Sequence, residues 1–191
     1  MKKIGIVTDS HSSISQEEAK KLGIFVLPMP FYIDGECYYE SVTLSRELFF
    51  EKLTSGADIS TSQPSPTAVM EIWDKALEEY EKILYMPISS GLSSSYNTAM
   101  MLAQEEKYEG RVLVVDDGQV AAPLHQMILD TLDMIEKGYE AEHIRELLEK
   151  AGDRMMIYIA LQTLEFLKKG GRVTPAAAAL GSVFNIKPIL K

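Results

Sequence analysis

The chain has 191 residues, of which 46% are hydrophobic and 25% are charged, proportions typical of a globular protein. Twenty-eight acidic against nineteen basic residues leave a net charge of −9, which disfavours binding to nucleic acid or to an anionic membrane surface. No stretch approaches the roughly 18 uninterrupted apolar residues of a membrane span. The polar run that begins at Asp9 makes the preceding apolar segment too short for a signal peptide. The single cysteine, Cys37, fits a reducing cytoplasm.

The first part of the chain predicts two short strands with a helix between them. The strands cover residues 4–8 and 24–27, which are short apolar runs. The helix covers residues 16–22, with Ser15 as its N-cap and Gly23 as the residue that ends it. We expect the first strand to deliver Asp9 and Ser10 into a polar loop.

A hairpin is predicted next. Pro28 and Pro30 stop the second strand, and apolar segments at 31–33 and 36–39 flank the pair Asp34-Gly35. Asp-Gly favours a type I′ turn, because both central residues of that turn need a positive φ. The pattern therefore predicts two short antiparallel strands joined by a tight turn.

Helices and strands alternate through the rest of the chain. Helices are predicted over 45–53, 67–79, 94–105, 123–137, 141–151, 164–169 and 175–180. Strands are predicted over 82–86, 111–115, 155–160 and 186–190. This alternation is typical of a mostly parallel sheet with helices on both faces.

We therefore predict an α/β fold with two parts. A three-layer parallel-sheet domain is expected over residues 1–153, followed by the start of a second α/β domain over 154–191. The chain stops in a predicted strand with no closing helix, and folds usually cover such an edge. We expect it to be a truncated portion of a longer protein.

Two hydroxyl-rich loops precede predicted helices. The first runs from Thr61 through Ser62 to Pro66, and the second is Ser89-Ser90-Gly91-Leu92-Ser93-Ser94-Ser95. Helix N-termini carry unpaired N–H groups and a partial positive charge, so a carboxylate or phosphate is favoured there. A lone serine at such a position is usually only an N-cap, and Ser/Thr/Pro clusters are common turns. The residues leave both interpretations open, although five serines exceed what one cap requires.

Other chemistry is less well supported. Ser93 lies in a Gly-x-Ser segment, but Ser95 replaces the second glycine of a nucleophile elbow, and His125 and His143 fall within predicted helices. Asp116-Asp117 could hold Mg²⁺, yet acidic pairs at strand ends more often cap turns. We expect no metal and no cofactor, and the residues alone favour Arg172 as a surface residue after a helix end.

Five motifs together resemble the DegV family, and the likeness runs along essentially the whole chain. They are Thr8-Asp9-Ser10, Thr61-Ser62-Gln63-Pro64-Ser65, Ile88-Ser89-Ser90-Gly91-Leu92-Ser93, Lys169-Gly170-Gly171-Arg172 and Asn185-Ile186-Lys187-Pro188-Ile189-Leu190. Each motif is weak alone, whereas five in the family's order and spacing are specific.

The resemblance implies a fatty-acid-binding protein of two α/β domains, the second with an antiparallel sheet, and with the acyl chain in an apolar tunnel between them. It implies that Thr61 and Ser93 hold the carboxylate, helped by backbone N–H groups of the second loop. Ser62, Ser94 and Gly91 complete the expected ligand-binding set. It further implies a non-catalytic subunit of a fatty acid kinase, whose separate ATP-dependent kinase subunit phosphorylates the bound carboxylate, with Arg172 helping to dock that subunit.

The chain departs from the family pattern in three places. Ser94-Ser95 stands where Gly-Thr is usual, and Asp117 and Ala121-Ala122-Pro123 replace Ser- and Gly-containing segments. Family members run to roughly 280 residues, a normal two-domain length. A polar head-group partner in that further part is therefore absent here.

We expect a neutral cradle of hydroxyls and amides, because an arginine there would also neutralise the oxygen that must attack ATP. The apolar residues that could line the tunnel are better explained as core residues, namely Phe31, Ile33, Leu92, Met155 and Phe166. Two alternatives remain: a serine esterase or acyltransferase using Ser93, and a sensor of another small anionic ligand.

Overall fold

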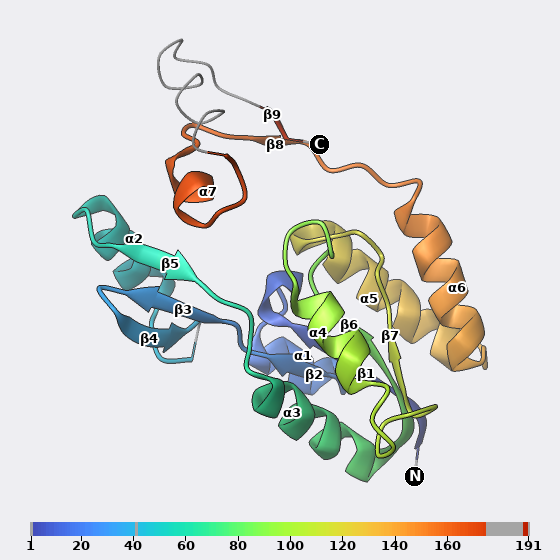
Figure 1. The fold of residues 1–191 in the computed structure, drawn as a ribbon. Helices are drawn as coiled ribbons and strands as arrows, with labels where there is room; N and C mark the ends of the chain where they lie inside the picture. The colour runs from blue at the N-terminus through green and yellow to red at the C-terminus, as the bar shows by residue number, and fades with distance from the viewer. Residues whose placement is uncertain (1, 41, 175–188, 191) are drawn as a thin grey trace.

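The computed structural model describes residues 2–40, 42–174 and 189–190. Its centre is a four-stranded, all-parallel sheet with the order β2-β1-β6-β7. The strands are β1 (Lys2–Asp9), β2 (Phe25–Leu27), β6 (Tyr80–Met86) and β7 (Val112–Val114). Figure 1 shows these strands at the middle of the molecule. The predicted parallel α/β fold is confirmed.

Helices cover both faces of this sheet. One face packs against α1 (Gln16–Leu22), α5 (Ala121–Glu136) and α6 (Ala141–Gly152), and the other against α3 (Pro66–Glu79) and α4 (Ser95–Leu102). Successive strand residues point to opposite faces, so Ile6 of β1 joins the first core and Val7 joins the second. Because both faces are buried, the central parts of β1 and β6 are apolar, and the helices on the two faces give a three-layer arrangement.

A small antiparallel sheet of order β4-β3-β5 stands beside the parallel sheet. It consists of β3 (Pro30–Ile33), β4 (Glu36–Tyr39) and β5 (Ile59–Thr61), packed against α2 (Arg46–Thr54). Asp34 and Gly35 have φ of 51° and 84°, as a type I′ turn requires. The predicted hairpin is therefore confirmed.

Strand β5 is absent from the prediction, and Pro30 begins a strand instead of only ending one. The segment Ile-Ser-Thr of β5 is too short to show alternation, and it becomes a strand only because Phe31 pairs with Thr61. A proline is tolerated at the first residue of a strand, which is the position of Pro30 in β3.

Small differences occur at helix ends. The helix predicted over 94–105 ends at Leu102, and the helix predicted from 123 begins at Ala121. Ala121 has φ of 55°, an uncommon value for a residue with a side chain, so the Ala-Ala-Pro stretch forms a strained first turn. Among the described helices, none is long and apolar enough to cross a membrane.

The segment after α6 differs most from the prediction. The strand expected over 155–160 is reduced to β8 (Ile159–Ala160), which pairs antiparallel with β9 (Ile189–Leu190), and α7 covers Glu165–Lys169. No described residue after Leu148 is buried, so residues 155–158 have no core against which to form a strand. The predicted helix at 175–180 and the start of the predicted strand, 186–188, lie outside the described residues.

Candidate functional site

A cavity of about 590 Å³ lies where the small antiparallel sheet meets the carboxyl end of the parallel sheet. Small-molecule sites commonly measure roughly 300–1,000 Å³, so the cavity is large enough for an organic ligand. Its wall comes from the link after β1, from α2 with β3 and β5, from the loop after β6, and from Arg172.

The topology of the parallel sheet explains this location. The chain leaves β1 toward β2 on one side, whereas it leaves β6 toward β7 on the other. The loops after β1 and β6 therefore diverge at the carboxyl edge, which is where open α/β sheets bind ligands. Ser10 and His11 follow β1, and Ile88, Leu92 and Ser93 follow β6, and all five line the cavity.

The hydroxyl of Ser93 is arranged as a hydrogen-bond donor. Its Oγ accepts from the backbone N of Ser95 at 3.2 Å and from the Ser95 hydroxyl at 3.0 Å. A hydroxyl has one proton and two lone pairs, so both acceptor positions are in use and the proton remains for another partner. The residue is half-buried in the cavity wall. Ser93 can therefore offer its proton to an anionic oxygen there.

The Thr61 loop reaches the same cavity from the small sheet. Thr61 ends β5, Ser62 follows with its N–H donating to the Pro30 carbonyl at 3.4 Å, and both line the cavity. Gln63 anchors the loop to α4, because its Oε1 accepts from the Thr98 hydroxyl at 3.1 Å. The structure thus places Thr61, Ser62 and Ser93 in the wall of one cavity.

Gly91 and Ser94 have other positions. Neither is among the lining residues, and the Gly91 N–H donates to Ser89 Oγ at 3.2 Å. The amides of Leu92 and Ser93 both donate to the Ser89 carbonyl, at 3.0 and 3.2 Å. These loop amides, which we expected to help hold a carboxylate, are already paired because the loop folds back on itself.

Aromatic and aliphatic side chains also line the cavity. Phe31 of β3 packs edge-on against Phe49 of α2, with ring centroids 5.5 Å apart. The apolar lining residues contributed by the small sheet, α2 and their connections are Phe31, Leu44, Phe49, Phe50 and Ile59. The cavity lining therefore combines hydroxyl groups with aromatic and aliphatic side chains.

The expected tunnel residues are divided between the cavity and other places. Phe31 and Leu92 line the cavity, whereas Ile33 is buried in the core of the small sheet. Met155 and Phe166 are exposed and do not line it.

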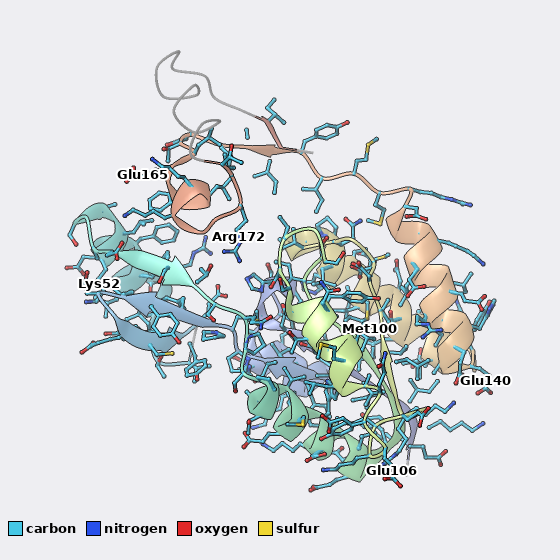
Figure 2. The ribbon with its side chains drawn as sticks, in the orientation of Figure 1. Lys52, Met100, Glu106, Glu140, Glu165 and Arg172 are labelled. Carbon is cyan, nitrogen blue, oxygen red and sulfur yellow. The ribbon has the colours of Figure 1, made fainter. Side chains whose placement is uncertain are left out.

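Arg172 lies against the loop after β6. Its side chain is drawn beneath α7, toward the parallel sheet (Figure 2), and its Nε donates to the Leu92 carbonyl at 3.4 Å. It is exposed and lines the cavity, as does Arg46 of α2. Contacts between distant segments therefore bring two guanidinium groups to the lining of the cavity, and the neutral head-group cradle stays a prediction.

A histidine–aspartate pair in the cavity region is absent from the sequence prediction. Asp9 is fully buried at the end of β1, where it accepts from the backbone N of Ile88 at 2.8 Å and of His11 at 2.9 Å. Its Oδ1 also lies 3.2 Å from His11 Nδ1, and the His11 ring lines the cavity. The sequence feature that could have predicted this pair is the position of Asp9 at the end of a buried strand, directly before Ser10 and His11.

Comparison of the whole chain with known proteins identifies its family. Residues 3–191 match the family model described as "Uncharacterised protein, DegV family". The chain belongs to the DegV family. The DegV domain-containing protein of Deinococcus radiodurans is 35% identical over 188 residues, which make up 98% of this chain and 66% of that protein. The DegV domain-containing protein of Streptococcus pneumoniae is 34% identical, covering 98% and 67%.

Solved DegV structures share the fold. A Thermus thermophilus DegV family protein described by its fatty-acid binding superposes with a TM-score of 0.85 at 34% identity, covering 98% of this chain and 67% of that one. DegV of Bacillus subtilis, described as a fatty acid binding protein, gives 0.84 at 25% identity, covering 100% and 68%. A stearic acid-binding protein of Eubacterium ventriosum gives 0.77 at 25%, covering 95% and 64%. The chain thus spans about two-thirds of the length of these relatives.

The acidic pair of this DegV chain accepts hydrogen bonds from its own turn and from the loop after β6. Asp116 Oδ1 accepts from the N–H groups of Ser90 and Gly118, at 3.3 and 3.2 Å. Asp117 is buried, and burial raises its pKa to about 6, opposed by the hydrogen bond from the Gln119 N–H. Among the described residues, no cluster of three metal-ligating side chains occurs.

The other two histidines lie away from Ser93. His125 pairs with Glu18 at 3.3 Å, and the His143 ring stacks on Tyr139. Neither lines the cavity, and within the described part of the chain Ser93 Oγ hydrogen-bonds to Ser95 alone. Neither histidine is therefore placed to act as a base on Ser93.

Proposed function

We propose that this DegV chain binds a long-chain fatty acid in the cavity between its two sheets. The observation that carries the proposal is that Thr61, Ser62 and Ser93 line one cavity together with aromatic and aliphatic side chains. The fatty-acid binding described for the Thermus and Bacillus proteins supports the same ligand class. In this proposal Gly91 and Ser94 shape the loop and make no contact with the carboxylate.

The apolar and the hydroxyl-bearing residues of the cavity contribute differently to binding. Each buried methylene contributes about 0.8 kcal/mol, so the acyl chain supplies most of the driving force. A hydroxyl hydrogen bond to a charged oxygen contributes roughly 1.5–3 kcal/mol. The hydroxyls therefore fix the register of the ligand and distinguish an acid from an uncharged lipid.

The chain would act without catalysing a reaction, as a carrier in the cytoplasm. A separate ATP-dependent kinase subunit would transfer the γ-phosphoryl group of ATP to a carboxylate oxygen, forming an acyl-phosphate and releasing ADP. Arg172 is exposed at the cavity rim, where it could contact such a partner as well as the ligand. The comparison proteins support fatty-acid binding, and the kinase partnership is our proposal.

Ligand identity is tested by native mass spectrometry of the purified protein, followed by titration with palmitate, methyl palmitate and butyrate. We expect a co-purifying fatty acid and a preference for palmitate over both analogues, because methyl palmitate lacks the anion and butyrate lacks most methylenes. Equal binding of palmitate and methyl palmitate would contradict the head-group assignment. Preferential binding of butyrate would favour a sensor of small anions.

An esterase is the second candidate because Asp9 and His11 form the acid–base half of a triad beside the cavity that Ser93 also lines. The absence of a hydrogen bond between His11 and Ser93 weighs against it within the described structure. A fluorophosphonate probe separates the candidates: stable labelling of Ser93 would support the esterase, and no labelling is expected for a carrier.

A further inference from the structure

His11 is held in place at the cavity by the end of strand β1. Its Nδ1 lies 3.2 Å from Asp9 Oδ1, and Asp9 is itself fixed by N–H groups of His11 and Ile88. The His11 side chain keeps 36% of its surface exposed, while that of Asp9 is fully buried. The ring is therefore oriented from one side and open on the other.

The Asp9 contact determines which ring nitrogen is available. A carboxylate accepts hydrogen bonds, so Nδ1 carries the proton that it donates to Asp9. Within the part of the chain that the structure describes, Nε2 has no hydrogen-bond partner. Neutral His11 thus presents a lone pair at Nε2, and protonated His11 presents an N–H donor.

Charged groups from several elements surround the ring. Burial and the charge of Arg172 lower the pKa of His11. The hydrogen bond to Asp9 and the charges of Asp9 and Glu40 raise it, and the net result is a raised pKa. Glu40 follows β4, Arg172 follows α7, and Arg46 of α2 also lines the cavity. The protonated ring is therefore compatible with its surroundings.

We propose that protonated His11 is a further ligand of the fatty-acid carboxylate, so that binding is accompanied by proton uptake. This inference rests on the proposed fatty-acid function. A carboxylate beside Nε2 favours the charged ring and raises the pKa of His11 in the complex. The gain in affinity is complete below the pKa that His11 has in the free protein. It is lost as the pH rises through the pKa that His11 has in the complex.

The test is the pH dependence of affinity in the wild type and in His11→Asn, whose amide can still donate to Asp9 but cannot titrate. The ligand is palmitate labelled with ¹³C at the carboxyl, whose resonance reports its own ionisation at each pH. We expect the wild-type affinity to fall about tenfold between about pH 6 and pH 9, which is a typical effect of one charged hydrogen bond. The variant should bind with nearly the same weak affinity throughout.

Proton uptake is measured independently by NMR titration of the wild-type histidine rings, with His125 and His143 as internal references. Palmitate should raise the pKa of His11 and leave the other two unchanged. Equal pH profiles for wild type and variant, or an unchanged His11 pKa on binding, would overturn the inference while leaving the proposed function intact. Absence of palmitate binding at every pH would instead overturn the proposed function.

Discussion

At the scale of single residues, the hydroxyl of Ser93 is committed to donation because Ser95 occupies both of its acceptor positions. Ser94, its neighbour, caps α4 without a side-chain hydrogen bond and lies outside the cavity lining. The two serines therefore form a matched pair for mutation, because Ser93 lines the cavity and Ser94 does not.

We expect Ser93→Ala to weaken palmitate binding by about tenfold, the lower end of the effect of one hydrogen bond to a charged oxygen. Acyl-phosphate formation with the kinase subunit should fall much further, because the carboxylate loses its register. Ser94→Ala should leave both nearly unchanged. Palmitate affinity and the rate of acyl-phosphate formation are measured on the same preparations. Acyl-phosphate formation at the wild-type rate with Ser93→Ala would contradict the proposal that Ser93 binds the carboxylate.

The buried carboxyl of Asp117 is a residue whose charge costs stability. Its pKa is raised from 3.8 to about 6, chiefly by burial, and Oδ2 has no hydrogen-bond partner among the described residues. The folded protein thus holds the proton more tightly than the unfolded chain, so the free energy of unfolding falls as pH rises from about 4 to about 6 and stays reduced above it.

Asp117→Asn should remove this dependence. Urea unfolding near pH 8 should show a gain of about 1–3 kcal/mol, with little change below about pH 3, where the wild-type carboxyl is mostly protonated in both states. Asp116→Asn provides the control, because Asp116 is only partly buried and its replacement leaves the Asp117 carboxyl to titrate. An unaltered pH profile in Asp117→Asn would refute the assigned cause.

At the scale of elements, the small sheet depends on its turn because it has a small core of its own. Ile33, Leu44 and Ile59 are its buried residues. Asp34 adopts a positive φ, its N–H donates to the Asp58 carbonyl at 2.9 Å, and its Oδ1 accepts from the Asp58 N–H at 2.9 Å. The turn thereby joins β3 to the start of β5, which supports one wall of the cavity.

Asp34→Ala should lower the free energy of local opening by about 1–2 kcal/mol, since it removes a hydrogen bond and places alanine in the left-handed region. Asp34→Asn, which tolerates that region and keeps an acceptor oxygen, should be nearly neutral. Hydrogen exchange of the β3 and β5 amides measures both. Equal protection in wild type and Asp34→Ala would show that the turn does not determine the free energy of local opening of the small sheet.

At the scale of the whole molecule, burial stops before the last described segment. Residues 155–174 contribute no buried side chain, and Met156, Tyr158 and Phe166 are exposed by 60%, 64% and 47%. Two exposed polar contacts join this segment to the remainder, namely Lys169 to Asp58 and Arg172 to the Leu92 carbonyl. The boundary we propose after residue 153 predicts that this segment opens independently of the parallel-sheet domain.

Limited trypsin digestion tests that boundary. The first cuts should follow Arg154, Lys168, Lys169 or Arg172, because backbone with few buried contacts opens at little cost. A resistant fragment ending near residue 153 should remain and should still unfold cooperatively. First cuts within the sheet domain would place the boundary elsewhere.

The sequence by itself determined the features that neighbouring residues encode. The apolar runs of β1 and β6 are strands because both faces of a parallel sheet are buried. Ser15 and Ser45 cap helices through hydrogen bonds to residues three positions later. The Asp34-Gly35 turn likewise needs only its own backbone preference. The five motifs also identified the DegV family before any contact was known.

Only the tertiary structure decided the composition of the cavity. Strand β5 exists because Phe31 pairs with Thr61, the His11 ring is oriented by the buried Asp9, and Arg172 reaches Leu92 across 80 positions of sequence. Each of these contacts requires the chain to close a loop or to bury a strand end, so its energy comes from packing of distant segments. Local propensity carries no information on such packing. For that reason the hydroxyl loops and Arg172 were predicted, whereas the positions of His11 and Arg46 in the lining of the same cavity were not.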